Sequence, residues 1–356
     1  MPRARDLEVV IGGLPPGPTN SVLDVAGVGL GHATVHRDEP APPEGRGTAR
    51  TGVTTLLLAD DAYLRPLPAG GAVLNGAGEC TGFLGAAEWG AVLTPVYLTS
   101  TMQVGRVYDA ACQIALERHP EVADDVVIPV VAECDDSYLN DCRRMQVEAD
   151  DVRASYEAAL ASRGAGEPPA EGAVGAGTGM SCFDFKGGIG TASRVTPEGH
   201  TVAVLLLTNF GAREECVVAG VPVGRLLGPA ASGPRAPAGS CIGVVVTDAA
   251  VDGAACARLA RRIGLGLGRS GSVAHHGSGE IFLGVGTGLR LAQDGSPERA
   301  DLVAGRALDP LFAATVEAAE EAVLNSMFGA PTTTGRDGNT SHSLHSPDVL
   351  ALLEDR

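Results

Sequence analysis

The chain has 356 residues and a formal net charge of −17 at neutral pH. Such an acidic balance argues against nucleic acid or an anionic membrane surface as its main partner. Hydrophobic residues make up 44% and charged residues 19% of the sequence, which is typical of a folded globular protein and excludes a disordered one. No run of 18 apolar residues is present, so we expect no membrane-spanning helix.

Six apolar runs bounded by Gly, Pro or Asp predict buried strands. They are rich in Val, Leu and Ile, and few of them alternate between apolar and polar positions, so both faces of each strand should be covered. We therefore expect layers above and below the sheet. The runs are residues 53–58, 92–98, 126–131, 202–208, 241–247 and 281–285.

Three amphipathic helices are expected among these strands, at residues 106–118, 254–267 and 310–328. In the last one, Asp309 is the expected N-cap, Pro310 the first helical residue, and Gly329 the end of the helix. Its apolar stripe should be part of the core rather than a cofactor site. The stripe consists of Phe312, Val316, Ala319, Val323 and Met327.

Two segments rich in glycine, proline and alanine look like exposed connections, at residues 161–172 and 228–239. The second one leads directly into Ser240 and then into the apolar run 241–247. Loops of this composition are usually open to proteases.

The eight cysteines contain no C-x-x-C pair, and most stand beside apolar residues. They indicate reduced, partly buried thiols in a cytoplasmic protein, and the N-terminus lacks the apolar core of a secretory signal. His275 and His276 are adjacent, so in a strand they would point in opposite directions. No histidine spacing typical of a metal site is present, so we expect neither a metal nor another cofactor.

A glycine run at residues 172–179 resembles a phosphate-binding loop only superficially. It lacks the G-K-[ST] ending, and no acidic residue that would bind a ribose is well placed after it. We expect tight turns and close backbone approach there instead.

Small and polar residues stand where several predicted strands begin or end. Ser240 precedes the run 241–247, Asn209 follows the run 202–208, and Glu133 follows the run 126–131. Ser278 and Glu280 straddle one glycine, so in extended backbone both side chains would face one side. Each residue alone is typical of a loop end or a turn.

Taken together, these patches resemble the DmpA family, the L-aminopeptidase/D-amidase-esterases, which includes the β-peptidyl aminopeptidases. Each fragment alone is weak, but their order and their spread over nearly the whole chain make the resemblance specific. The fragments are 20–32 (NSVLDVAGVGLGH), 50–54 (RTGVT), 137–141 (SYLND), 175–179 (GAGTG), 186–191 (KGGIGT), 209–211 (NFG), 239–240 (GS), 246–249 (VTDA), 278–280 (SGE), 320–326 (EEAVLNS) and 335–338 (GRDG).

The resemblance implies one catalytic domain over residues 1–356, folded as a four-layer α/β/β/α sandwich like that of N-terminal-nucleophile hydrolases. It implies that the chain cuts itself between Gly239 and Ser240, giving an α chain of residues 1–239 and a β chain of residues 240–356. It further implies a homo-oligomer, a tetramer or larger, of these α/β heterodimers. The substrates would be small peptides, amides or esters of L-amino acids, or of D- or β-amino acids.

In the implied mechanism, the Ser240 hydroxyl attacks the Gly239 carbonyl in a strained turn, where glycine avoids a Cβ clash. Cleavage frees the α-amine of Ser240. An α-amine has an ordinary pKa of about 8, so it can act as the base for its own hydroxyl near neutral pH. This would explain why the chain shows no Ser-His-Asp arrangement.

The family's other roles transfer to matching positions of this chain. Asn209 matches the oxyanion-hole asparagine. Ser278 and Glu280 match the pair that holds the terminal amine and hydroxyl of the nucleophile. Glu133 matches the acid that receives the substrate's free ammonium, and Tyr138 is a candidate hydrogen-bond partner near the tetrahedral intermediate.

Lys186 is the one lysine among 26 basic residues. It matches a lysine of the family's Lys-Gly-Gly segment, where a buried ammonium would lower the pKa of the α-amine and support the oxyanion or Asn209. Alternatively, it is a structural lysine paired with a carboxylate.

Several alternatives stay open at this point. Cys241 is a second candidate nucleophile, because cysteine serves as an N-terminal nucleophile in other proteins. An acyltransferase similar to the ornithine acetyltransferases, an endo-amidase of the nylon-oligomer type, and a binding protein without catalysis are the other readings of the same fold.

Overall fold

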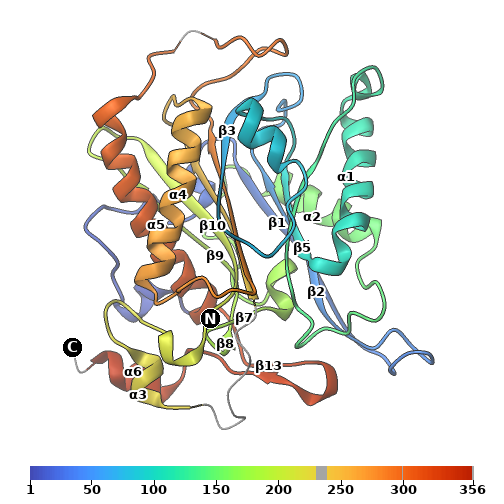
Figure 1. Cartoon of the computed structure of the whole chain (residues 1–356), viewed down its shortest axis with the longest axis vertical. Helices are drawn as coiled ribbons and strands as arrows, with labels where there is room; N and C mark the ends of the chain where they lie inside the picture. Colours follow the sequence, from blue (N-terminus) through green and yellow to red (C-terminus); the bar gives the residue numbers. More distant parts are fainter. Residues whose placement is uncertain (230–238, 299, 355–356) are drawn as a thin grey trace.

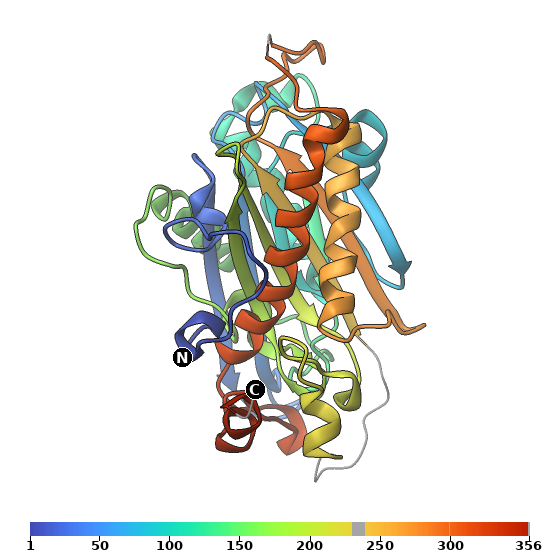
Figure 2. The same cartoon turned by 90° about the vertical axis from the view of Figure 1, so that its left-hand side faces the viewer.

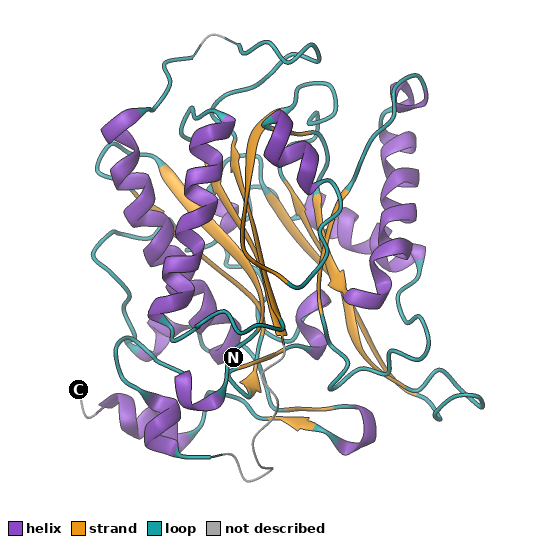
Figure 3. Ribbon diagram, in the orientation of Figure 1, coloured by secondary structure: helices purple, strands orange, loops and turns teal. Residues whose placement is uncertain are grey.

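Two β-sheets are stacked face to face between two layers of helices (Figures 1 and 3). The computed structural model describes residues 1–229, 239–298 and 300–354. The expected connection at 228–239 therefore falls mostly outside the described residues. The order of layers, helix–sheet–sheet–helix, confirms the predicted α/β/β/α sandwich.

The smaller sheet has four strands and is covered on its outer face by two helices. Its strand order is β1 (Gly29–Asp38), β2 (Thr48–Leu57), β5 (Val96–Ser100) and β6 (Val130–Cys134). Helices α1 (Val104–Arg118) and α2 (Ala149–Ala161) pack on it and bury one hydrophobic cluster with it.

The larger sheet has six strands and carries the candidate site. Its strand order is β4 (Ala91–Val92), β3 (Leu67–Gly76), β12 (Ser278–Gly286), β11 (Gly239–Thr247), β10 (Thr201–Asn209) and β9 (Gly188–Val195). Helices α4 (Gly253–Arg269) and α5 (Asp309–Phe328) run side by side over its outer face (Figure 2). The pair β11–β12 is parallel because α4 connects the two strands as a crossover.

Shorter elements gather at the end of the sandwich that is lowest in Figure 1. They are β7 (Ser181–Cys182), β8 (Phe185–Lys186), α3 (Val223–Leu227), β13 (Thr333–Thr334), β14 (Thr340–Ser341) and α6 (Pro347–Glu354). In the described part of the chain, no helix is long and apolar enough to cross a membrane.

The strands of the larger sheet are apolar on both faces, as predicted, because each face has its own core. Along β11, Ile242, Val244 and Val246 belong to the cluster between the two sheets. Cys241 and Val245 belong to the cluster under α4 and α5. Alternation along the strand sends successive side chains to opposite faces.

The predicted runs 202–208, 241–247 and 281–285 lie within β10, β11 and β12, and the run 53–58 overlaps β2, which ends at Leu57. The run 92–98 was wrong as one strand, since β4 and β5 lie in different sheets and Pro95, which has no N–H to pair, stands between them. The run 126–131 was also wrong in extent. β6 begins only at Val130, and Val126 is 81% exposed.

The three predicted helices are α1, α4 and α5, but the predicted cap of α5 was wrong. Leu308 holds the N-cap position without a side-chain hydrogen bond, and Asp309 is already helical. Phe312, Ala319, Val323 and Met327 of the predicted stripe are core, but Val316 is only partly buried. The helix is buried well beyond the stripe because it packs against both β9 and α4.

A buried ion cluster attaches the N-terminal segment and β9 to α5. The Arg194 guanidinium and the Glu321 carboxylate are both fully buried and lie 2.6 Å apart. Arg5 also contacts Glu321, at 2.9 Å, and Arg194 reaches Glu317 at 3.2 Å. Because a buried charge is tolerated only when it is paired, removing one partner should be far more damaging than removing an exposed one.

We expect Arg194→Met to lower the free energy of unfolding by about 3–5 kcal/mol, because Glu321 would lose its fully buried partner. The matched control is Arg153→Met, whose partner Glu117 is about half exposed, and for which we expect a loss of about 1 kcal/mol or less. Denaturant unfolding measures both. Equal losses for the two variants would contradict the role of the buried cluster.

Candidate active site

The candidate nucleophile lies at the start of β11, one of the two central strands of the larger sheet. Ser240 is the second residue of β11, and Asn209 is its direct cross-strand partner on β10. On the other side, β12 pairs in parallel, with Gly279 level with Ser240. Three segments that are far apart in the sequence thus meet at one point because of strand register alone.

Glycine at position 239 is required by close packing and not by a strained turn, which corrects the expectation above. Gly239 is the first residue of β11 and pairs with Ser278. A Cβ atom built on it would lie 1.8 Å from the Asn209 carbonyl oxygen, so no side chain fits. The bond between Gly239 and Ser240 is therefore held at the edge of a regular strand.

The Ser240 and Asn209 side chains face the space between the two sheets. Two residues along each strand, Ile242 and Leu207 belong to the inter-sheet core, and alternation gives Ser240 and Asn209 the same direction. From the opposite sheet, Cys134 of β6 approaches Ser240 within hydrogen-bond reach of its hydroxyl. Ser240 is only 3% exposed, so in the intact chain its hydroxyl is closed off from solvent.

The Asn209 amide is fixed at both of its polar atoms. Its Oδ1 accepts a hydrogen bond from the Ser181 backbone N–H at 2.9 Å, and its Nδ2 donates to the Asp135 carbonyl at 2.7 Å. An amide nitrogen carries two N–H groups, so a second donor is available in a fixed orientation.

Ser278 and Glu280 lie on one face of β12, as predicted, and the Ser278 hydroxyl donates to Glu280 Oε1. Phe282 continues the same alternation into the core under α4 and α5, so this face is opposite to the one where the Ser240 hydroxyl lies. The pair therefore reaches the backbone nitrogen at the start of β11 more readily than the hydroxyl. Glu280 is fully buried, and its Oε2 has no hydrogen-bond partner among the described residues.

Glu133 is buried at the end of β6 and is held by two donors. Its Oε1 accepts the Glu79 backbone N–H at 2.8 Å, and its Oε2 accepts the Thr101 hydroxyl. Burial raises the pKa of Glu133, and the two hydrogen bonds act against that effect. The carboxylate thus has a fixed orientation next to Cys134, one residue from the contact with Ser240.

Tyr138 lies farther along the loop that follows β6. Its hydroxyl donates to the Thr340 carbonyl of β14 at 3.4 Å. Asn339 also donates to the Tyr138 carbonyl at 2.8 Å, so the loop 135–141 is fixed to the β13–β14 hairpin.

Lys186 is fully buried and donates three hydrogen bonds to carbonyl oxygens, of Gly177 (3.0 Å), Met180 (2.7 Å) and Gly187 (2.7 Å). Burial lowers the pKa of Lys186 to about 7. All three hydrogen bonds are with backbone, and the charge of Asp136 acts on the ammonium as well, raising its pKa against the effect of burial. The lysine thus braces the segment that presents the Ser181 N–H to Asn209.

The two cysteines beside the site differ in where they face. Cys241 pairs with Thr208 rather than Asn209 and lies in the core under the helices. Cys134 faces Ser240 from the opposite sheet. Burial raises the pKa of both thiols well above the ordinary value, so neither is a ready thiolate. All eight cysteines are free, as predicted.

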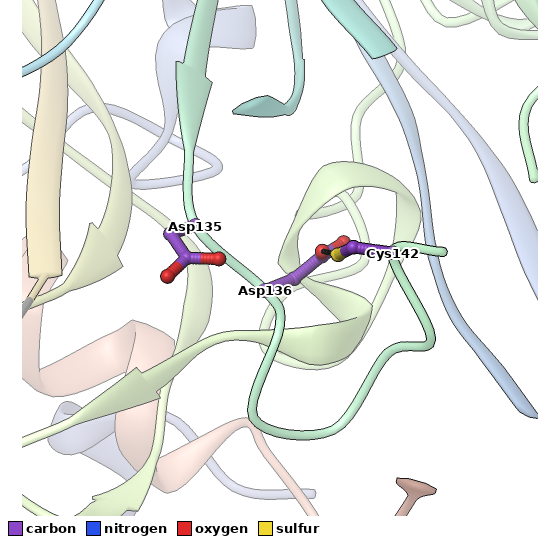
Figure 4. A group of neighbouring side chains, drawn as sticks. All are labelled: Asp135, Asp136 and Cys142. Carbon is purple, nitrogen blue, oxygen red and sulfur yellow. Dashed lines mark hydrogen bonds between the residues drawn. The ribbon is translucent and has the colours of Figure 1, made fainter. Parts of the chain in front are cut away.

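Asp135, Asp136 and Cys142 form a group of potential metal ligands beside the site (Figure 4). Asp136 already accepts hydrogen bonds from Ser100 (2.7 Å), Asn140 (3.0 Å) and the Cys142 thiol (3.4 Å). Burial, and then the charge of Asp136, raise the pKa of Cys142, whereas a metal requires a thiolate. All three hydrogen bonds go to Oδ1 of Asp136, and its buried Oδ2 has no hydrogen-bond partner among the described residues.

Sequence reasoning missed the residues that orient the site. Ser181, Asp135, Thr101 and Glu79 act through backbone groups or through one hydroxyl, over separations that no local pattern reveals. Cys134 directly follows Glu133 in the sequence, and nothing in that position indicates a contact with Ser240. Its contact with Ser240 depends on the stacking of the two sheets.

Comparison with known proteins gives consistent matches over the whole chain. The family model of peptidase family S58 matches residues 20–341. The β-peptidyl aminopeptidase BapA of Sphingosinicella xenopeptidilytica is 37% identical over 100% of this chain and 92% of its own.

Two solved structures share the fold at similar identity. A β-aminopeptidase from Burkholderia sp. superposes with a TM-score of 0.88 at 36% identity, over 99% of each chain. The L-aminopeptidase D-Ala-esterase/amidase of Ochrobactrum anthropi, described as a prototype of the serine aminopeptidases and a variant of the Ntn hydrolase fold, gives 0.88 at 33% identity, over 100% of this chain and 99% of its own. With this fold, and with Ser240 paired to Asn209 in its larger sheet, the chain belongs to peptidase family S58.

Proposed function

We propose that this chain is a self-processing serine aminopeptidase that releases N-terminal residues from short peptides, amides and esters, with Ser240 as its N-terminal nucleophile. The observation that carries the proposal is the register of three adjacent strands, in which Ser240 stands between Asn209 and the Ser278–Glu280 pair. Relatives named β-peptidyl aminopeptidase, and the L-aminopeptidase D-Ala-esterase/amidase, support N-terminal residues of the L-, D- or β-type as the substrate class.

Maturation begins in the intact chain. The Ser240 hydroxyl attacks the Gly239 carbonyl carbon, the C–N bond breaks, and the acyl group moves from nitrogen to oxygen as an ester. Water then hydrolyses this ester, leaving a carboxylate on Gly239 and a free α-amine on Ser240. The burial of Ser240, at 3% exposure, supports a cleavage inside one chain rather than by a second molecule.

The freed α-amine supplies the base that the site otherwise lacks. Its ordinary pKa of about 8 lets it take the proton of its own hydroxyl near neutral pH. Glu280 Oε2, which is buried and has no partner among the described residues, is a suitable acceptor for the N–H groups of this amine. Ser278 orients that carboxylate through its hydroxyl.

Asn209 supplies the oxyanion donor. One of its N–H groups is used by the Asp135 carbonyl, and Ser181 fixes Oδ1, so the second N–H has a defined direction on the side where Ser240 lies. Preorganised donors of this kind typically stabilise a tetrahedral intermediate by about 3–4 kcal/mol. Tyr138 lies on the loop that follows β6, as Asp135 does. We assign it a second contact with the reacting group, farther out than that of Asn209.

Glu133 supplies the exopeptidase specificity. Its carboxylate is held by Glu79 and Thr101 next to Gly78, which lies beside Gly279, the residue level with Ser240. A carboxylate there attracts the free ammonium of a substrate. Such recognition favours an aminopeptidase over an endo-amidase, and membership of a peptidase family favours hydrolysis over acyl transfer.

The proposal includes a cytoplasmic homo-oligomer, a tetramer or larger, of α/β heterodimers. Eight free cysteines suit a reducing compartment. Exposed Leu84 (80%), Trp89 (78%) and Val126 (81%) supply apolar surface for contacts between subunits.

Purified protein should run as two bands of about 24 and 12 kDa, in proportion to the lengths of residues 1–239 and 240–356 within 36.0 kDa. Ser240→Ala should remain one intact band without hydrolysis, because it lacks the hydroxyl for both steps. Cys241→Ala is the matched control and should mature normally. Denaturing gels, intact mass and release of p-nitroaniline from aminoacyl p-nitroanilides measure this, and an active Ser240→Ala protein would refute the proposal.

Glu133→Gln should raise the KM for substrates with a free amine by at least about tenfold, because the ammonium would lose its buried counter-charge. Glu79→Gln removes the same charge at an exposed neighbouring residue and should change KM little. Amine-blocked substrates should be inert with the wild-type enzyme. Their cleavage would instead indicate an endo-amidase.

Burial lowers the pKa of Lys186 to about 7, whereas the guanidinium in Lys186→Arg stays charged and cannot donate from one atom to three carbonyl oxygens. We expect it to slow maturation and lower kcat by about 10- to 100-fold, because the Ser181 N–H that orients Asn209 would shift. Rates of band appearance and kcat on matured protein measure this. If maturation and turnover were unchanged in this variant, Lys186 would contribute only its charge and not the geometry of its hydrogen bonds.

A further inference from the structure

One carboxylate oxygen, Oδ1 of Asp136, joins the end of β5 to the loop that follows β6. The Ser100 hydroxyl donates to it at 2.7 Å, the Asn140 side-chain amide at 3.0 Å and the Cys142 thiol at 3.4 Å. The meeting of this carboxylate with the thiol is visible in Figure 4. Asp136 is fully buried, and the proposed mechanism leaves it without a role.

The peptide group that precedes Asp136 holds the candidate oxyanion donor. Asn209 Nδ2 donates to the Asp135 carbonyl at 2.7 Å, and that carbonyl belongs to the peptide bond between Asp135 and Asp136. The main chain of Asp136 is fixed on its other side as well, because its own carbonyl accepts the N–H groups of Leu139 at 3.1 Å and Asn140 at 2.9 Å. The direction of the Asp135 carbonyl therefore depends on where Asp136 is held.

Asp136 also packs against the segment that fixes the other polar atom of the Asn209 amide. A Cβ atom built on Gly179 would lie 2.7 Å from the Asp136 Cβ, so the two residues lie in close contact. Two residues after Gly179, the Ser181 N–H donates to Asn209 Oδ1 at 2.9 Å. Both segments that orient Asn209 thus meet at Asp136.

The Ser100 hydroxyl links the same carboxylate to Glu133. Ser100 is the last residue of β5 and pairs with Cys134 of β6. The next residue, Thr101, donates its hydroxyl to Glu133 Oε2. The contact between Ser100 and Asp136 therefore helps to place the hydroxyl that orients Glu133.

We propose that Asp136 is a positioning residue that holds Asn209 and Glu133 in a fixed position relative to each other. This inference rests on the proposed function, in which Asn209 stabilises the oxyanion and Glu133 receives the ammonium of the substrate. The two residues lie in different sheets, Asn209 on β10 and Glu133 on β6, so pairing of neighbouring strands does not set the distance between them. The hydrogen bonds at Asp136 Oδ1 supply that connection.

The hydrogen bonds of Asp136 can be separated from its charge, which also acts on Lys186. Asp136→Asn removes the charge but keeps an acceptor oxygen for the three donors. Its amide nitrogen would take the place of Oδ2, which has no hydrogen-bond partner among the described residues, so no existing donor would be displaced. Asp136→Ala removes both the charge and the acceptor.

The first test is kcat on matured protein, measured with aminoacyl p-nitroanilides. We expect Asp136→Ala to lower kcat by about 10- to 100-fold, because the Asp135 carbonyl would no longer hold Asn209 in one orientation. Asp136→Asn should keep kcat within about threefold of the wild-type value, because its hydrogen bonds persist.

Asp141 supplies the matched control in the same loop. It is buried too, and the three hydrogen bonds that its carboxylate accepts among the described residues all come from Arg143, at 2.6, 2.9 and 3.1 Å. Asp141→Ala should therefore lower the stability against denaturant, as Asp136→Ala does, but leave kcat near the wild-type value.

Ser100→Ala tests the branch that leads to Glu133. We expect it to raise the KM for substrates with a free amine by about 3- to 10-fold, and to change kcat less than KM, because Thr101 would hold Glu133 less firmly while Asn140 and Cys142 still hold Asp136. This variant decides the question if Asp136→Ala fails to fold or to mature.

The outcomes separate the ideas. A loss of kcat in Asp136→Ala that is absent from both Asp136→Asn and Asp141→Ala supports the inference, as does a rise of KM in Ser100→Ala. Equal kcat in Asp136→Ala and Asp141→Ala, equal impairment of the two Asp136 variants, or an unchanged KM in Ser100→Ala overturns it and leaves Ser240 catalysis intact. Hydrolysis that persists in Ser240→Ala, measured in the same panel, overturns the proposed function and this inference with it.

Discussion

The register of β11 between an antiparallel and a parallel neighbour is the constraint on which the site depends. Antiparallel pairing brings Asn209 level with Ser240, and parallel pairing through the α4 crossover brings Ser278, Gly279 and Glu280 alongside. A shift of one residue in either pair would send these side chains to the opposite faces of the sheet. The apolar residues farther along the strands prevent such a shift, because each face of the sheet has its own buried core.

The candidate site residues lie on both faces of the larger sheet, with different groups on each face. The inter-sheet face presents the Ser240 hydroxyl, Asn209 and Cys134, whereas the helix-covered face presents Ser278 and Glu280. The backbone nitrogen of Ser240 lies in the plane of the sheet, between these two faces. The Ser240 hydroxyl and the Glu280 carboxylate can therefore approach this nitrogen from opposite sides. This arrangement suits a residue that is to serve as a nucleophile through its side chain and as a base through its main chain.

The sequence predicted the main helices, the central strands and the layers, because these depend on apolar patterns that are continuous along the chain. It did not predict β3 or β9, whose glycines and small polar residues weaken the strand signal, or α2, whose apolar stripe is short. For the site, the resemblance identified residues at strand ends. The hydrogen bonds that orient them come from Ser181, Asp135 and Thr101, and these depend on how distant segments pack, which no spacing in the sequence encodes.

The intact chain holds a buried carboxylate whose second oxygen has no partner in the described structure. A buried acceptor without a hydrogen bond is unfavourable by about 1–3 kcal/mol. In the intact chain, the Ser240 nitrogen is an amide with one N–H, which the sheet can use, whereas cleavage turns it into an amine that has additional N–H groups and accepts a proton. The intact chain therefore leaves this acceptor oxygen without a donor, whereas the cleaved chain would provide one. Strand pairing stabilises the intact chain despite this unpaired acceptor. In the proposed function, cleavage would provide donors for it, so the same carboxylate would favour maturation and then hold the α-amine of the mature site.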